Sequence, residues 1–249
     1  GATFDSSAAT NTLPSTVVTT TGTQTLTNKS IATTQLTGTI TPSDSTVTLA
    51  KLTATGTQDA TTFLRGDNTF AEAGGGAYNL LSTTTILSAV GTVDITSNID
   101  STYRDYMFIL SDIHTSADDV TLNVRVFSSN GSPDGTANTY NWAGVGYRSD
   151  NAGLNTADAA HDYGQISLWG QGADANEAGS VILYMFNPSG TTHNKSFMST
   201  SMAQTIDGRT AVGTNGFLYR NGTVAVTGLR FAPNAGTIQS GVIKLYGIS

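Results

Sequence analysis

Hydrophobic and polar residues alternate along several segments of residues 77–249. Valine or leucine occupies every second position from Val120 to Val126, so these side chains would share one face of an extended strand. Residues 223–231 alternate in much the same way. Val181–Phe186 is instead a continuous apolar run that is too short for most helices, and it indicates a strand buried on both faces. These patterns predict β-strands.

Further strands are predicted between turn signals that are rich in Gly, Asn and Pro. The turn signals include Asn130-Gly131, Asn187-Pro188 and Asn221-Gly222. The segments between such signals are 78–86, 89–95, 104–113, 138–148, 161–170, 195–204, 209–219 and 236–248. Many short strands with this spacing are typical of an all-β protein with two packed sheets. We therefore expect residues 77–249 to form a jelly-roll-like β-sandwich head.

Residues 1–73 have a different composition, which is dominated by Thr and Ser. Apolar residues are sparse, and those from Leu26 to Ile40 lie about five apart, which suits neither a helix nor an alternating strand. Such a segment alone cannot bury enough apolar surface to offset its ordering entropy. Two alternatives follow: a flexible low-complexity linker, or an extended β stem in which three copies share these residues as a core. Gly74–Gly76 would form a hinge between this stem and the head.

Composition and charge narrow the classes of partner. Only 12% of the residues are charged, the net charge is −7 and the sequence pI is about 4.6. Nucleic-acid binding draws on cations that displace counterions from phosphate, so an acidic chain is a poor candidate for it. The same charge argument disfavours binding to anionic membranes, and no run approaches the roughly 20 apolar residues of a membrane span. We expect neither a nucleic-acid partner nor membrane insertion.

Residues suited to catalysis or metal binding do not form a recognisable motif. The chain has no cysteine, and His114, His161 and His193 do not lie at a metal-ligand spacing. His161 and Asp162 are neighbours, and neighbours on a strand point to opposite faces. No Gly-x-Ser-x-Gly elbow is present. The oxygen-rich segment 172–177 fits a surface loop better than a calcium site. We expect no enzyme activity, no cofactor and no bound metal.

Aromatic residues are concentrated in two segments of the predicted head. They are Tyr140, Trp142, Tyr147, Tyr163 and Trp169. Sugars are commonly gripped by an aromatic face, with nearby amide or carboxylate groups such as Asn141 and Asp162 fixing the hydroxyls. The alternative is that both tryptophans belong to the core, because Trp is usually largely buried. The five aromatic residues are the candidate ligand-binding residues.

Three segments of the chain have sequences similar to those of a known protein family. TGTQTLTNKSI, residues 21–31, is similar to the stem of many bacteriophage tail fibres, and TTFLRGDNTFAEA, residues 61–73, is similar to a junction before their terminal domains. The junction often carries Gly and then Trp where this chain has Asn68 and Phe70. Residues 241–248 resemble the last strand of those terminal domains. The resemblance covers the stem and junction segments well, but it covers the rest of the predicted head only loosely.

The resemblance implies a homotrimer in the phage tail, outside the bacterial cell. Its N-terminal part would join other tail proteins, and its terminal domain would attach the virion to a receptor on the host surface, with a glycan expected and a protein as the alternative. Two other functions stay open: a virion decoration or head fibre protein, and a polysaccharide-degrading tailspike. Fold and family do not by themselves decide between them.

Overall fold

The computed structural model describes residues 55–57, 59–60, 62–72, 76–128, 131–221 and 223–249. Most of the predicted stem and two of the three predicted hinge glycines therefore lie outside the described residues. The described residues contain no helix, and accordingly none long and apolar enough to cross a membrane. The prediction of an all-β protein is confirmed.

A short hairpin lies within the segment that resembles a fibre junction. Its strands are β1 (Thr62–Leu64) and β2 (Phe70–Glu72), and Arg65–Asn68 form the turn between them. The Asp67 carboxylate accepts hydrogen bonds from the Thr69 backbone N–H at 3.1 Å and from the Thr69 hydroxyl at 2.6 Å. Asn68 has a φ of 65°, a left-handed conformation that Gly and Asn adopt most readily. Asn at the position where fibre junctions often carry Gly is therefore compatible with the same turn.

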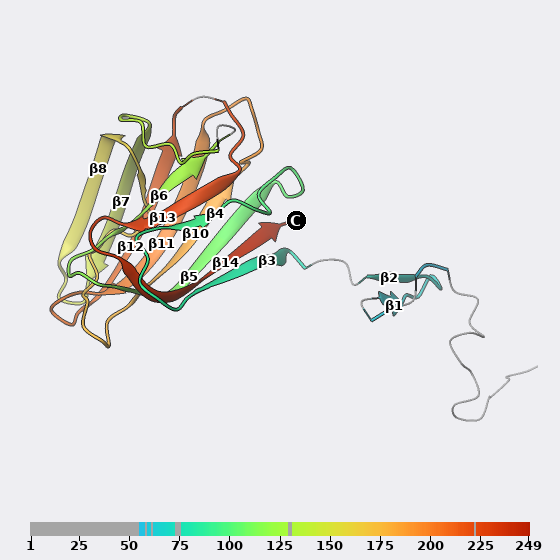
Figure 1. Ribbon diagram of the computed structural model, residues 1–249, viewed down its shortest axis with the longest axis horizontal. Coiled ribbons are helices and arrows are strands. Elements are labelled where there is room, and N and C mark those ends of the chain that lie inside the picture. Colours follow the sequence, from blue (N-terminus) through green and yellow to red (C-terminus); the bar gives the residue numbers. More distant parts are fainter. Residues whose placement is uncertain (1–54, 58, 61, 73–75, 129–130, 222) are drawn as a thin grey trace, which may run out of the picture. The chain divides into compact units, whose positions relative to one another are not determined.

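The remaining strands form two antiparallel sheets (Figure 1). The larger has eight strands in the order β3 (Tyr78–Ile86), β14 (Ile238–Ile248), β5 (Asp105–Thr115), β10 (Gly179–Phe186), β11 (Lys195–Gln204), β12 (Thr210–Tyr219), β7 (Tyr140–Arg148) and β8 (Gly153–His161). The smaller has four strands in the order β4 (Val93–Ile95), β13 (Gly228–Pro233), β6 (Leu122–Phe127) and β9 (Gly164–Gln165). In Figure 1 the smaller sheet lies in front of the larger one.

The core fills the space between the two sheets. The alternation predicted for β6 is confirmed, since Leu122, Val124 and Val126 are all buried in it. Phe108 of the larger sheet meets Phe231 of the smaller one edge to face, with ring centroids 5.3 Å apart. Burying an apolar side chain of this size stabilises the fold by roughly 1.5–3 kcal/mol. Residues of both sheets therefore share one hydrophobic core, as expected for a β-sandwich.

Four strand predictions need correction. Segment 161–170 contains only the short β9, whereas β8 was not predicted at all. β8 is an edge strand with most of its residues exposed, so its sequence lacks the alternation that marks a half-buried strand. Segment 89–95 is a strand only from Val93, and segment 223–231 is a strand only from Gly228. The expectation that Val181–Phe186 is buried on both faces is also wrong, because Ile182 and Phe186 are 39% and 38% exposed.

A buried carboxylate ties the loop before β7 to the sandwich. The Asp134 carboxylate accepts hydrogen bonds from the Tyr219 hydroxyl at 2.7 Å, the Asn221 side-chain amide at 2.6 Å and the Thr136 backbone N–H at 2.9 Å. Burial alone would raise the pKa of this carboxyl, but these hydrogen bonds outweigh it and lower the pKa to about 2. The charged form of Asp134 is therefore part of the folded structure.

Asp134→Asn should lower the free energy of unfolding at neutral pH by about 2 kcal/mol, since the pKa shift favours the charged form by roughly that amount. The lowered pKa stabilises the fold fully above the ordinary value of 3.8, and this stabilisation is lost as the pH falls towards 2. The difference between the two proteins in urea unfolding should therefore shrink over that pH window. Asp174→Asn, at an exposed loop position, is the control that should change little. An equally large loss at every pH would contradict the assignment.

Candidate functional site

The structure distributes the five predicted aromatic residues over several places. Tyr140 is fully buried, and its hydroxyl accepts a hydrogen bond from the Val126 backbone N–H at 2.8 Å and donates one to the Asp134 carbonyl at 3.0 Å. Its ring packs against Tyr219 with centroids 5.3 Å apart. Neither face of the ring is left for a ligand, so Tyr140 is a core residue and its assignment as ligand-binding is corrected.

Trp142 and Tyr163 are brought together by His161. The His161 ring lies 6.0 Å from the Trp142 ring and 4.5 Å from the Tyr163 ring, between centroids. Its Nε2 atom is 2.9 Å from a carboxylate oxygen of Asp158, which pairs directly with Trp142 across β7 and β8. The neighbouring Asp162 instead pairs with Arg125. We call Trp142, His161 and Tyr163 the aromatic row.

Tyr147 and Trp169 lie towards the other end of β7. Tyr147 is 62% exposed, and its strand position pairs with Val212 of β12. Trp169 is half-buried beneath the Arg148 guanidinium, whose Cζ atom is 5.5 Å from the ring centroid. Arg148 in turn pairs with Asp150 at 2.8 Å. The five predicted residues therefore do not form one site, although two of them belong to the aromatic row.

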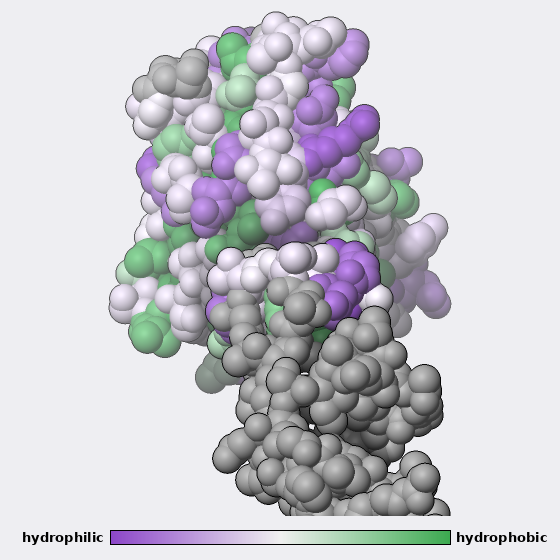
Figure 2. All heavy atoms as spheres, turned by 90° about the vertical axis from the view of Figure 1, so that its right-hand side faces the viewer, coloured by the Kyte–Doolittle hydropathy of each residue, from purple (hydrophilic) through white to green (hydrophobic). Residues whose placement is uncertain are grey.

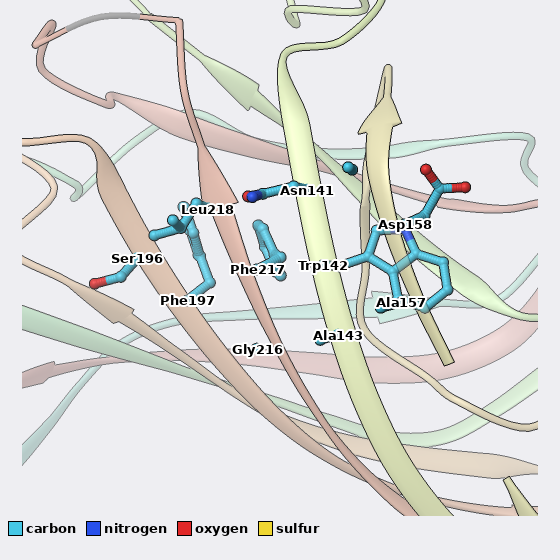
Figure 3. A pocket seen from close by; sticks show the side chains of 11 residues that line it. Asn141, Trp142, Ala143, Ala157, Asp158, Ser196, Phe197, Gly216, Phe217 and Leu218 are labelled. Atoms are coloured by element: carbon cyan, nitrogen blue, oxygen red, sulfur yellow. The ribbon is translucent and has the colours of Figure 1, made fainter. Parts of the chain in front are cut away.

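A shallow trough of about 540 Å³ crosses the larger sheet above Trp142 (Figure 3). It is lined by Asn141, Trp142, Ala143, Ala157, Asp158, Ala159, Ser196, Phe197, Gly216, Phe217 and Leu218. Gly216 pairs with Ala143, and Ala143 pairs with Ala157, so small residues are aligned across three neighbouring strands. Figure 3 shows the Trp142 indole extending from β7 towards β8, where Asp158 lies. Sequence alone could not reveal this trough, because its floor depends on strand register.

Exposed apolar side chains also lie along the side of the larger sheet that faces away from the core, from Leu218 at the trough to Val212 and Tyr147 further along β12 and β7. They are Val145, Tyr147, Ile182, Phe186, Met198, Met202, Val212 and Leu218, each between 38% and 62% exposed. We call these residues the apolar outer face. The outward positions of β7, β10, β11 and β12 carry no Asp, Glu, Lys or Arg. When one face of a sheet is in contact with water, its strands usually place apolar residues towards the core and polar residues towards the solvent. An extended exposed apolar patch instead marks an interaction site.

The side of the protein at which β3 and the C-terminus lie has a different distribution of hydrophobic residues. Figure 2 shows the side at which β3 and the C-terminus lie, and hydrophobic residues there form small separate patches among polar ones. Scattered apolar residues of that kind are normal for a protein surface. The concentration of uncharged apolar side chains on β7, β10, β11 and β12 therefore stands out from this background.

Comparisons with known proteins found no similar protein from which a function could be inferred. No family model matches the chain, and searches of curated proteins and of solved structures found no match. Among the described residues, no group of three or more His, Asp or Glu side chains is placed to hold a metal ion. The apolar outer face, the trough and the aromatic row are thus the features from which a function is inferred.

Removing the His161 ring should expose Trp142. Trp142 is only 9% exposed, and the His161 imidazole is one of the neighbouring groups that pack near its ring. In a Trp169→Phe background, which leaves Trp142 as the single fluorophore of its kind, His161→Ala should shift the emission to longer wavelength and increase quenching by acrylamide. His193→Ala, at an exposed position, is the matched control. Emission that is unchanged by His161→Ala would show that the aromatic row does not shield Trp142.

Proposed function

We propose that this chain is a bacteriophage tail fibre protein that attaches the virion to a bacterial surface receptor, with a glycan as the expected receptor. In this proposal the sandwich is a jelly-roll-like head, residues 1–73 are a stem, and both parts associate as a homotrimer. The apolar outer face is the observation that carries the proposal. The resemblance of residues 21–31 and 61–73 to fibre stems and junctions supports it independently.

Association through the apolar outer face follows from its composition. Side chains such as Met198, Met202 and Val212 gain free energy when a neighbouring copy removes them from water. An interface built around uncharged side chains also avoids the cost of burying ions without partners. Identical chains usually associate with closed symmetry, and three copies around one axis would also let the sparse apolar residues of the stem form a shared core.

Attachment by such a trimer is multivalent. Three equivalent sites on one fibre, repeated over several fibres, raise the overall avidity above that of any single site. A rigid antiparallel sandwich suits this role, because binding residues on surface loops are held in place by a stable scaffold. We therefore favour binding over catalysis as the activity of the head.

The association can be tested by measuring molar mass with light scattering. The full chain, 25.8 kDa, should give the mass of three copies. Met202→Lys should shift the mass towards one copy, because it places a charge opposite Val212 within the apolar outer face. Ile206→Lys is the matched control, since Ile206 is similarly exposed at 57% but lies in the turn between β11 and β12. A wild-type chain with the mass of one copy would contradict the proposal.

Attachment can be tested by incubating the fluorescently labelled full chain with a panel of whole bacterial cells. We expect saturable retention on some strains, competed by unlabelled chain. Met202→Lys should weaken the retention on the order of 100-fold, because avidity is lost when copies separate. Retention by no strain would argue against receptor attachment. Steady release of reducing sugar ends from capsular polysaccharide would point instead to a tailspike enzyme.

A further inference from the structure

The smaller sheet carries a polar pocket on the side facing away from the core. The pocket has a volume of about 330 Å³, within the range of small-molecule sites. Its lining consists of Thr92, Asn123, Val124, Arg125, Asp162, Tyr163, Arg230, Ala232, Pro233 and Asn234. These residues come mainly from β6, β13 and the loop before β9, and β6 and β13 lie in front in Figure 1. The pocket is therefore on the opposite side of the sandwich from the apolar outer face.

Two arginines lie side by side in this pocket. Arg125 of β6 and Arg230 of β13 are directly opposite each other in the strand register. Like charges in that position destabilise a sheet unless they are compensated. Arg230 is held by two hydrogen bonds of 2.6 Å to the Asp94 carboxylate, and Arg125 pairs with Asp162. Each guanidinium has five N–H donors, more than these carboxylate contacts use, so donors remain for a ligand.

The charges of this cluster balance. Arg125 and Arg230 supply two positive charges, and Asp94 and Asp162 supply two negative ones. An anionic ligand would have to approach Asp162, which lines the pocket, and a cationic ligand would have to approach both guanidinium groups. A neutral ligand that both donates and accepts hydrogen bonds meets neither repulsion. Sugar hydroxyl groups have this property, because each carries one donor and two acceptor lone pairs.

Asn123 provides an unused acceptor in the same pocket. The residue is only 5% exposed, and its Oδ1 atom has no hydrogen-bond partner among the described residues. A buried polar atom without a partner costs free energy, so such an atom at a pocket wall indicates a missing partner. Asn123 is opposite Ala232, whose small side chain leaves room next to the amide. If the Asn123 amide turned towards the pocket, a ligand hydroxyl donating to Oδ1 would satisfy this group.

We propose that this pocket binds one neutral sugar residue, a hexose or an N-acetylhexosamine, of the host glycan. Hydroxyl groups would bond to the arginine–aspartate pairs and to Asn123, while the apolar side of the sugar ring would contact Tyr163 and Pro233. This proposal rests on the proposed function, because it names the ligand class through which the head attaches. The pocket stays open when copies associate through the apolar outer face.

The test uses the full chain and saturation-transfer NMR with three probes: D-galactose, N-acetyl-D-glucosamine and D-glucuronate. We expect at least one neutral sugar to bind with a dissociation constant on the order of 1 mM and to bind more tightly than D-glucuronate. Ala232→Leu, which fills the pocket, should weaken that binding at least tenfold. Ala175→Leu, at an exposed loop position, is the matched control.

A second variant separates ligand contact from folding. Asn123→Leu removes the partnerless acceptor and replaces it with an apolar group of similar volume, so the melting temperature should not fall. The affinity for the neutral sugar should nevertheless drop. Reduced affinity with an unchanged melting temperature supports a contact between Asn123 and the ligand.

Three results would overturn the pocket assignment: no sugar binds, D-glucuronate binds more tightly than both neutral sugars, or Ala232→Leu leaves neutral-sugar binding unchanged. None of these results contradicts the proposed function if the labelled chain is still retained by bacterial cells. Conversely, sugar binding that Ala232→Leu abolishes, without retention on any strain, would support the pocket and argue against attachment. The two failures are therefore distinguishable.

Discussion

The antiparallel register of the eight-stranded sheet is the constraint on which the other surfaces depend. Pairing that places Phe197 opposite Phe217 inside the core also places Met198 opposite Gly216 on the outside. Successive side chains of a strand point to opposite faces, so a slip of one residue would exchange the two sets. The core, the apolar outer face and the trough are therefore consequences of the same strand pairing, and none of them can change independently of the other two.

The two outward-facing sides of the sandwich differ in the charged residues that they carry. The outward positions of β7, β10, β11 and β12 carry no charged residue, which suits a surface that a neighbouring copy covers. The smaller sheet keeps Arg125 and Arg230 on its outside, but each is paired with an aspartate. Paired charges in contact with water keep donors and acceptors for a polar ligand. In the proposed fibre protein, this division would give association and ligand binding to opposite sides of one scaffold.

Carboxylates also connect the loops to this scaffold. Asp134 is buried and joins the loop before β7 to Tyr219 of β12. Asp150, in the turn between β7 and β8, has a pKa lowered to about 2, first by its hydrogen bonds with Arg148. Arg209, in the turn just before β12, also contacts Asp150, at 3.0 Å. The loops at both ends of β7 are thus fixed by charged groups, whereas the strands between them depend on apolar packing.

The sequence alone determined the all-β class and most strands, because alternation such as that from Val120 to Val126 has a period that only an extended chain buries on one side. It also showed the aromatic residues of a possible site, yet it could not separate Tyr140 in the core from Tyr147 on the surface. Edge strand β8 gave no alternation signal. The trough and the pairing of Arg125 with Arg230 arise between strands distant in sequence, and the row through His161 depends on how β7 and β8 pair. Only tertiary structure decided them, because register and sheet order determine which side chains meet.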